Sequence, residues 1–291
     1  MQFFLQVALS GIANGAIYGL IAVGYSLTFM TTNVLNFALG MWVMIGGMLT
    51  YSLIVRMGLP PSLVLPIVMV GLFLLGVIAE RISVYPFLRA GSDVWVMSTL
   101  AVGLLFIDFA ELIWGRSPTP VPPYVSDNPL HIGPIVILPQ QFLTLATAIL
   151  LFLLLEYFYR RTLLGKAFRA VAHSAETASL MGINSRAVQL TSYAAAAALA
   201  GLAGFMVVPL TLAEPQLGTV LGLKAFAIAI IAGLGAPGGI LLCGLGYGAL
   251  EGLISGYLNT GLRDILGFSL MIFVLFVRPE GLFGKVQSER A

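Results

Sequence analysis

The first 55 residues decide the fold class, because no charged side chain interrupts them. They read MQFFLQVALSGIANGAIYGLIAVGYSLTFMTTNVLNFALGMWVMIGGMLTYSLIV and are followed by Arg56. A helix needs about 20 predominantly apolar residues to cross the hydrocarbon core of a bilayer. The stretch is long enough for two such helices, so we expect a membrane protein. No basic segment precedes the apolar run, and we therefore do not expect a cleaved signal peptide.

The composition of the whole chain indicates the same class. Of its 291 residues, 59% are hydrophobic and 9% are charged, whereas soluble domains carry about 25% charged residues. A net charge of +2 indicates membrane lipid and no nucleic acid as the surroundings, since membrane chains often carry extra basic residues in cytoplasmic loops. The single cysteine, Cys243, excludes a disulfide or a cysteine metal site within the chain. We expect no metal site.

Further apolar runs predict an all-α, polytopic transmembrane bundle of about eight or nine spans. Helix is expected because the backbone must satisfy its own hydrogen bonds in lipid. The stretch 214–231 could include a re-entrant piece, which leaves the number of spans open. We expect a single transmembrane domain over residues 1–291, with helices near 4–30, 34–55, 62–80, 94–114, 142–159, 187–210, 222–235, 239–257 and 264–278.

Basic residues set the expected orientation. They gather in three segments that fall on one side of the expected topology: Arg81 and Arg89; Arg160, Arg161, Lys166, Arg169 and Arg186; and Arg278, Lys285 and Arg290. The positive-inside tendency makes that side cytoplasmic, so the loop at about 160–186 and the C-terminus are expected inside. The loop at about 115–140 is rich in proline and poor in charge, and we expect it outside. Nine spans would also put the N-terminus outside.

Two glycine stripes predict close packing between helices. They consist of Gly11, Gly15 and Gly19 in one apolar run, and of Gly244, Gly248, Gly252 and Gly256 in another. Small residues at four-residue spacing let helix backbones approach each other. We interpret both stripes as packing surfaces without a functional meaning of their own.

Catalytic and nucleotide-binding motifs are missing or lack their context. Residues 233–238 spell G-x-G-x-x-G, but they lie between apolar runs, without the strand and acidic partner of a dinucleotide site, and predict a turn between spans. No P-loop and no H-E-x-x-H occur in the chain. Neither His131 nor His173 lies in an expected span, so no base is placed there to activate a serine. We expect no enzyme activity, no ATPase site and no cofactor.

Polar residues within the apolar runs are the candidates for a solute pathway. Ionisable groups at membrane depth usually face a bundle interior or an aqueous path, but groups near a helix end can reach water instead. A structural role and a pathway role are about equally supported for Glu214, Lys224 and Glu251. Asn14 and Tyr18 lie one turn apart on one face, where they could bind a solute or a neighbouring helix. The candidate pathway residues are Asn14, Tyr18, Asn33, Asn36 and Lys224.

A short helix outside the membrane is expected within the basic loop. Ser174 is a good N-cap, Glu176 suits the first turn, and Gly182 suits the position after the last helical turn. Asn184 or Ser185 can then cap the next span. The expected helix presents small and apolar residues on one side, namely Ala175, Ala178 and Met181. The alternative is a solvated connector, which has no need of an apolar stripe.

The sequence of this loop is similar to a known signature. Glu176, Thr177, Ala178 and Gly182 match the E-A-A-x-x-x-G signature of ABC importer permeases, with threonine in the middle place and without the usual I-x-L-P downstream. The wider sequence resembles the branched-chain amino acid permease family of ABC importers, and within it the shorter, "H"-type subunit. The matching blocks occur in family order along nearly the whole chain: 15–24, 36–38 with Gly40, 199–204, 222–226, 233–238 and 278–282.

The resemblance implies a permease subunit of a bacterial ABC importer for branched-chain or related hydrophobic amino acids, embedded in the inner (plasma) membrane. A second homologous permease, two ATP-binding subunits and an extracytoplasmic solute-binding protein would complete the importer. In such systems a short cytoplasmic helix docks into a groove of the ATPase. The match implies that this coupling site consists of Ser174, Glu176, Thr177, Ala178, Met181, Gly182 and Ile183.

One departure from the family leaves the solute open. Family members commonly carry a His-Gly-acidic run after Asn-Phe-Ala, whereas this chain has Leu39-Gly40-Met41-Trp42. If that region lines the path, its apolarity indicates a different solute, and relatives also carry urea, short amides or aromatic acids. An ion-coupled secondary transporter is the alternative from another class, and it would need ion sites at mid-membrane. A scaffold subunit without a path would have a fully dry bundle.

Overall fold

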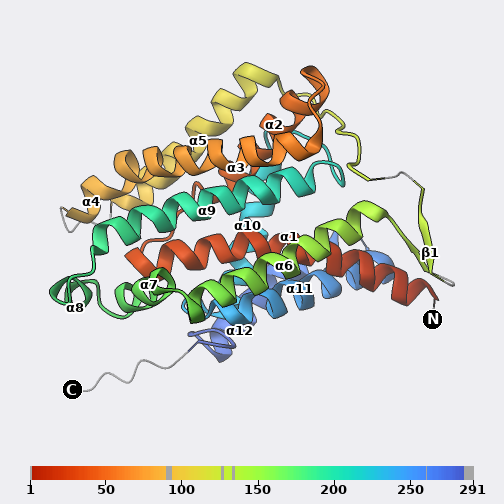
Figure 1. Ribbon diagram of the computed structural model, residues 1–291. Helices are drawn as coiled ribbons and strands as arrows, with labels where there is room; N and C mark the ends of the chain where they lie inside the picture. Colours follow the sequence, from red (N-terminus) through yellow and green to blue (C-terminus); the bar gives the residue numbers. More distant parts are fainter. Residues whose placement is uncertain (1, 90–93, 126–127, 133–134, 260, 285–291) are drawn as a thin grey trace.

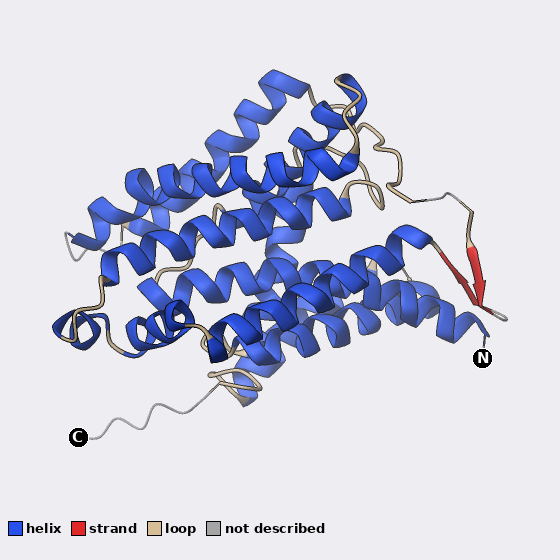
Figure 2. Ribbon diagram, in the orientation of Figure 1, coloured by secondary structure: helices blue, strands red, loops and turns tan. Residues whose placement is uncertain are grey.

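The computed structural model describes residues 2–89, 94–125, 128–132, 135–259 and 261–284. Within them the chain is almost entirely helical, with a single two-stranded sheet (Figure 2). Two π-helical turns, η1 (Ser52–Arg56) and η2 (Glu80–Val84), extend helices α2 and α3. The strands are β1 (Leu130–Ile132) and β2 (Ile135–Ile137). The helices are α1 (Gln2–Thr32), α2 (Leu39–Tyr51), α3 (Pro61–Ala79), α4 (Tyr85–Arg89), α5 (Trp95–Trp114), α6 (Pro139–Arg161), α7 (Leu163–His173), α8 (Ala175–Leu180), α9 (Ser185–Val207), α10 (Leu217–Ala232), α11 (Pro237–Tyr257) and α12 (Leu262–Val277).

The predicted fold class is confirmed, because every expected apolar run forms a helix. Seven helices of the described part are long and apolar enough to cross a membrane by length and composition. The two remaining runs form α10 and α12, with 16 residues each. At about 1.5 Å per residue these two helices are roughly 24 Å long, somewhat less than the hydrocarbon core. They account for the difference between the seven long helices and the eight or nine predicted spans.

Three local features differ from the prediction. Helix α2 begins at Leu39 and not near 34, because the chain turns after α1: Asn33 has a φ of 54°, and Asn36 Oδ1 accepts a hydrogen bond from the N–H of Ala38 at 3.1 Å. The basic loop contains the amphipathic helix α7 in addition to the expected short helix. The loop at 115–140 contains the antiparallel pair β1–β2, with Leu130 opposite Ile137.

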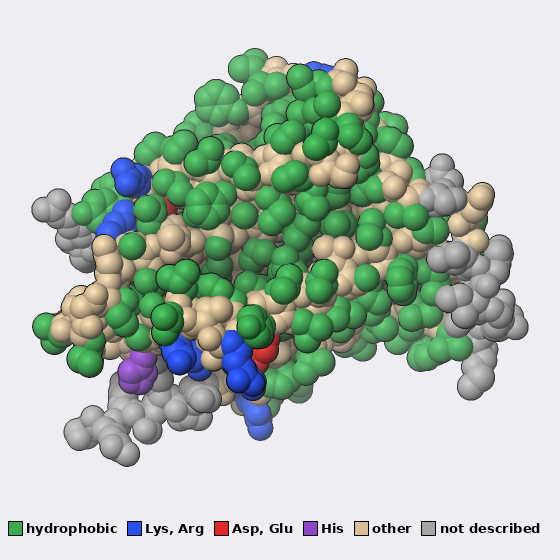
Figure 3. Space-filling view, in the orientation of Figure 1, with side chains coloured by type: hydrophobic (Ala, Val, Ile, Leu, Met, Phe, Trp, Pro, Cys, Tyr) green, Lys and Arg blue, Asp and Glu red, His purple; other side chains and the backbone are tan. Residues whose placement is uncertain are grey.

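The long helices lie side by side, so that the bundle has two distinct ends (Figure 1). The N-terminus and the β1–β2 pair lie at one end, and α4, α7 and α8 lie at the other. Most of the Lys and Arg side chains visible in Figure 3 lie toward this second end. The arrangement agrees with the predicted gathering of basic residues at one end of the bundle. Lys285 and Arg290 lie outside the described residues.

Burial divides the helices into central and peripheral ones. In the most apolar window of α9, 83% of the residues are buried, compared with 17% in α5 and in α6. Large apolar side chains on the two peripheral helices are exposed, among them Leu104 and Leu112 of α5 and Leu153 of α6. Soluble proteins rarely expose apolar surface of this extent. These faces fit the hydrocarbon of a bilayer, with α1, α2 and α9 in the protein interior.

The two predicted glycine stripes pack against each other. A Cβ added to Gly15 would lie 2.9 Å from the Cα of Gly248, and one added to Gly244 would lie 2.8 Å from the Cα of Gly19. Helices α1 and α11 therefore meet backbone to backbone, which only small residues allow. This close approach also brings Tyr18 of α1 beside the polar residues of α11.

The G-x-G-x-x-G segment forms the turn between α10 and α11, as predicted. Gly233 follows α10 with a φ of 95°. The segment after α12 folds back on this turn, since the N–H groups of Leu282 and Phe283 donate to the carbonyls of Ile231 at 2.8 Å and Ala232 at 3.0 Å. A Cβ added to Gly281 would lie 2.6 Å from the Cα of Gly233, so two of the sequence blocks singled out above, 233–238 and 278–282, are in contact.

Candidate functional site

Four charged side chains meet where α10, α11 and α12 join. Nζ of Lys224 lies 2.5 Å from Oε1 of Glu251 and 2.9 Å from Oδ1 of Asp264. Nε of Arg263 lies 2.8 Å from the same Glu251 oxygen and 3.6 Å from Oδ1 of Asp264. We call Lys224, Glu251, Arg263 and Asp264 the charge cluster. Its two cations balance its two anions, so it carries no net charge when all four groups are ionised.

The charge cluster runs from the protein interior toward an accessible side. Lys224 is 1% exposed and Glu251 is 6% exposed, whereas the side chain of Asp264 is 52% exposed. Removing a charge from water is costly, so a buried ion requires a well-placed partner. Ionisable residues inside a membrane bundle are commonly pathway residues or interior pairs. The charge cluster is therefore the strongest candidate for a functional site within the described helices.

Three of the five predicted pathway residues gather at the charge cluster. The hydroxyl of Tyr18 lies 3.4 Å from Oε1 of Glu251, to which it donates, and Nζ of Lys224 lies 5.5 Å from the centre of the Tyr18 ring. Asn14, one turn before Tyr18, lines a cavity together with Glu251. The sequence indicated that Asn14 and Tyr18 share a face, and the structure shows that this face meets α11.

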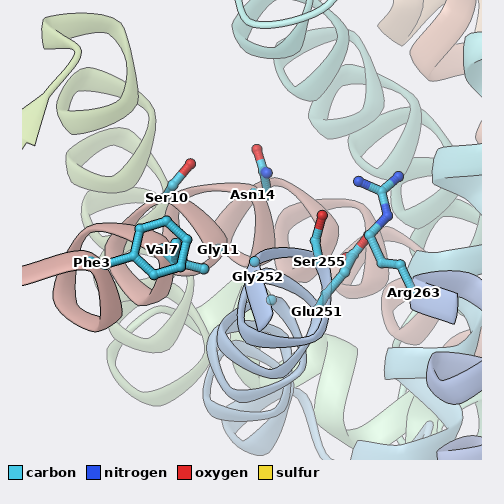
Figure 4. Close-up of a pocket in the computed structure, with 11 residues that line it drawn as sticks. Phe3, Val7, Ser10, Gly11, Asn14, Glu251, Gly252, Ser255 and Arg263 are labelled. Atoms are coloured by element: carbon cyan, nitrogen blue, oxygen red, sulfur yellow. The ribbon is translucent and has the colours of Figure 1, made fainter. Parts of the chain in front are cut away.

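A cavity of about 350 Å³ adjoins the charge cluster between α1 and α11 (Figure 4). Ser10, Asn14, Ser255 and Arg263 point to the same side of this helix pair. The apolar part of the lining comes from Phe3 and Val7 of α1. Sites for small molecules typically combine apolar walls with a few polar groups in a volume of roughly 300–1,000 Å³. The cavity has both properties at the small end of that range.

The other two predicted pathway residues lie elsewhere. Asn33 is exposed just after the end of α1. Asn36 is 1% exposed and precedes α2, where its Oδ1 holds the turn described above. Nδ2 of Asn36 has no hydrogen-bond partner within the described residues. Both asparagines shape the connection between α1 and α2, and no described contact links them to the charge cluster.

Arg263 and Asp264 were missed by the sequence reasoning. They lie at the start of the last apolar run, at a predicted helix end, where charged residues are ordinary, and they were not among the candidates. Glu251 was considered, but its two roles could not be separated. The sequence did contain a signal that could have identified them. Only 9% of this chain is charged, so two adjacent residues of opposite charge at the start of a span are uncommon. Their pairing with Lys224 depends on tertiary structure.

The short helix α8 has the caps that its sequence predicts. Oγ of Ser174 accepts a hydrogen bond from the N–H of Thr177 at 3.1 Å. Gly182 follows the helix with a φ of 83°, and the N–H of Ile183 donates to the carbonyl of Ala178 at 3.1 Å. Oδ1 of Asn184 then accepts from the N–H of Ala187 at 3.0 Å and caps α9. The segment between α7 and α9 is thus closely defined by local hydrogen bonds.

The members of the predicted apolar stripe of α8 differ in burial. Ala178 is buried, at 4% exposure, whereas Met181 is 80% exposed and lies after the last helical residue. Met181 is the C-cap of α8, and its N–H still donates to the carbonyl of Thr177 at 3.2 Å, so its exposure, and not the end of the helix, separates it from Ala178. The exposed apolar group is instead formed by Leu180, at 82% exposure, together with Met181.

A second ion pair ties this segment to the bundle. Arg186, at the start of α9, pairs with both carboxylate oxygens of Glu80 in η2, and Nη2 lies 2.7 Å from Oε2. The guanidinium also lies 3.8 Å from the centre of the Tyr85 ring. The Glu80 side chain has no exposed surface. The residues that follow α8 are therefore anchored to the end of α3.

Comparison with known proteins agrees with this architecture. A family model described as the permease component of branched-chain amino acid transport systems matches residues 7–275. The chain is 28% identical to the high-affinity branched-chain amino acid transport permease LivH of Salmonella typhimurium and 29% identical to LivH of Escherichia coli, with 99% of this chain and 98% of each relative covered. It is 29% identical to the permease BraD of Pseudomonas aeruginosa, over the same shares of the two chains. No solved structure matches the chain.

Proposed function

The chain belongs to the family of branched-chain amino acid transport system permease components, and on that basis we propose that it forms, with a second homologous permease, the pathway of an ABC importer. It is a multi-pass membrane permease of the branched-chain amino acid type. The proposed solutes are branched-chain or related hydrophobic amino acids. The family match from residue 7 to residue 275, which spans both the charge cluster and α8, carries the proposal.

The importer also needs subunits that this chain does not supply. We assign ATP hydrolysis to two separate ATP-binding subunits, because the chain contains no P-loop. An extracytoplasmic solute-binding protein would deliver the solute at the end that carries the N-terminus and the β1–β2 pair. The basic end, with the C-terminus, would then face the cytoplasm. The permease itself acts by changing which end of the pathway is open.

The proposed contact with the ATP-binding subunits is the segment 174–183. It projects at the basic end of the bundle (Figure 1), and Leu180 and Met181 expose apolar surface there. An exposed apolar helix end that local hydrogen bonds hold in place suits docking into a groove. Movement of this segment would reach α3 through Arg186 and Glu80, and α9 through the continuous chain.

Two of the residues at 39–42, where the chain departs from the family's His-Gly-acidic run, have packing roles. Trp42 is 1% exposed, so it fills the interior and does not line an open path. A Cβ added to Gly40 would lie 2.8 Å from the Cα of Gly222, which makes this glycine a contact point of α2 and α10. Apolarity at 39–42 therefore gives no reason to prefer urea, short amides or aromatic acids over amino acids.

Uptake by the reconstituted importer tests the proposal. The chain would be purified with its cognate permease and ATP-binding subunits, placed in proteoliposomes, and supplied with the binding protein outside. Radiolabelled leucine should accumulate when ATP is enclosed and not when ADP is enclosed. Accumulation driven by a proton or sodium gradient without ATP would instead establish the ion-coupled alternative. Uptake of urea or acetamide in place of leucine would show that the solute class is wrong.

A further inference from the structure

We propose that the charge cluster and the adjoining cavity form a binding site for the ammonium and carboxylate groups of a free amino acid. The inference rests on the proposed function and adds the chemical groups by which the pathway would recognise its solute. It would place recognition within this chain, in addition to any selection by a binding protein.

The first observation is an acceptor that remains unused. Oε1 of Glu251 is shared by Lys224, Arg263 and Tyr18. Oε2 of the same carboxylate is buried and has no hydrogen-bond partner within the described residues. Buried polar atoms usually find a partner, so each exception requires an explanation. Since Glu251 also lines the cavity, a rotation of its carboxylate would bring this oxygen to an ammonium group bound there, which would supply the missing donor.

The second observation is the balance of charge. A free amino acid carries one cation and one anion, and the charge cluster carries two of each. The carboxylate of the solute can pair with Arg263 while its ammonium pairs with Glu251, and Lys224 keeps Asp264 at 2.9 Å. No ion is then left unpaired in the interior, where an uncompensated charge is strongly unfavourable. Binding a lone cation or a lone anion would leave the neutral charge cluster with one uncompensated charge.

The third observation is the shape of the cavity. Its charged end, at Glu251 and Arg263, is continuous with an apolar part at Phe3 and Val7. Asn14 and Ser255 lie between them on one side of the helix pair (Figure 4). A leucine, with charges at one end and a branched alkyl group at the other, matches this order of polar and apolar groups. Urea and short amides match neither the charges nor the apolar part.

Protection of an introduced thiol tests the inference. Ser255→Cys would be made in a Cys243→Ser background, and the complete permease–ATPase complex would be labelled with a maleimide in lipid nanodiscs without binding protein. A site that is about 90% occupied leaves about a tenth of the thiols free, so saturating leucine should slow labelling about tenfold. The comparison ligands are 4-methylpentanoate, which lacks the ammonium, 3-methylbutylamine, which lacks the carboxylate, and urea. We expect none of them to protect.

Variants of the charge cluster separate recognition from structural support. Arg263→Gln removes the partner for the carboxylate. In this variant leucine and 3-methylbutylamine, which differ by that carboxylate, should slow labelling to the same extent. Glu251→Gln should abolish protection by leucine. Glu111→Gln, on α5 and paired with Arg116 just after that helix, is the matched control, and leucine should protect the thiol in it as in the parent. If Ser255→Cys itself impairs uptake, Ser10→Cys serves as the reporter from the opposite wall.

The outcomes distinguish this inference from the proposed function. If the reconstituted importer takes up leucine with ATP but leucine does not slow labelling of either thiol, the charge cluster is a structural support and the inference is overturned. The same conclusion follows if 4-methylpentanoate or urea protects as well as leucine. If the importer takes up no amino acid at all, the proposed function fails first.

Discussion

Arg186 and Glu80 form a two-pronged ion pair between the first turn of α9 and the π-helical turn after α3. Arg186 follows Met181 by five residues, so the pair joins the chain just beyond the proposed coupling segment to the end of α3. Single π-turns inside helices often mark functional sites, and here the π-turn η2 supplies the buried carboxylate. A displacement of α8 is therefore passed to two helices at once, α9 by the backbone and α3 by the ion pair.

The two members of this pair should not be equivalent in a stability measurement. The Glu80 side chain has no exposed surface, whereas that of Arg186 is 35% exposed. Arg186→Met leaves a buried carboxylate without a partner, which typically costs about 3–5 kcal/mol. The lower end applies because the arginine side of the pair is open to water. Glu80→Gln leaves an arginine that can turn to water, so it should be the milder change.

Thermal unfolding of the purified chain in detergent measures this difference. We expect the midpoint to fall more for Arg186→Met than for Glu80→Gln, with the double variant close to Glu80→Gln because neither charge remains. A double-mutant cycle isolates the coupling between the residues. Equal losses for the two single variants, with simple additivity in the double, would mean that the pair contributes little.

Gly182 should be required for uptake and not for folding. It has a φ of 83°, and a Cβ at this position would meet no atom within 4 Å. Gly182→Val therefore causes no clash, but it forces a left-handed conformation that costs a β-branched residue about 1–2 kcal/mol. The strain would be released by reorienting α8. We expect leucine uptake to be lost while the chain is still recovered in the membrane at normal amounts.

Gly115 provides a matched control for the backbone effect. It also has a φ of 83° and no neighbouring atom within 4 Å of an added Cβ, but it follows α5 at the opposite end of the bundle. Its ψ of −179° puts it in a backbone region that is essentially restricted to glycine, so Gly115→Val is strained at least as strongly, but away from the proposed coupling segment, and uptake should continue. Normal uptake by Gly182→Val would remove the assignment of 174–183 as the coupling segment.

The exposed end of α8 should determine association with the ATP-binding subunits. Leu180 is 82% exposed, and the neighbouring Ser179 is also exposed on the same helix. Leu180→Asp places a charge in the proposed apolar contact, where it would lose water without gaining a partner. Ser179→Asp adds the same charge one residue earlier. Co-purification should fall for Leu180→Asp and stay near normal for Ser179→Asp; equal co-purification of both variants would place the docking surface elsewhere.

The sequence was sufficient for the features that depend on local chemistry. The caps at Ser174 and Gly182 could be predicted because the relevant hydrogen bonds span only a few residues, and the helices could be predicted because lipid leaves few backbone alternatives. Asn14 and Tyr18 could be assigned to one face by helical periodicity. The partner of that face could not be identified, since nothing local relates Tyr18 to Glu251, which follows it by 233 residues.

The failures have the same origin. Arg263 and Asp264 were not among the candidates, because only the packing of α12 against α10 brings Asp264 to 2.9 Å from Lys224. Met181 was placed on one side with Ala175 and Ala178 by periodicity, but its 80% exposure, compared with 4% for Ala178, depends on what packs against α8. The glycine stripes were correctly interpreted as packing surfaces. That the two stripes are each other's partners follows from the tertiary structure alone.

The contact between these stripes should be the most sensitive packing feature of the bundle. A Cβ added to Gly248 would lie 2.5 Å from the backbone nitrogen of Gly15, and the backbone of α1 cannot yield as a flexible side chain would. Gly248→Leu must therefore separate α1 from α11, which would also remove Tyr18 from Glu251. Gly246 lies on the same helix, and a Cβ there would meet no atom within 4 Å, so Gly246→Leu adds equal bulk without the clash. Size-exclusion chromatography of membrane extracts should show a folded peak for Gly246→Leu and aggregated or absent protein for Gly248→Leu. A folded peak for both variants would show that α1 and α11 can move apart without loss of the bundle, and the close approach would then no longer explain how the charge cluster is held in place.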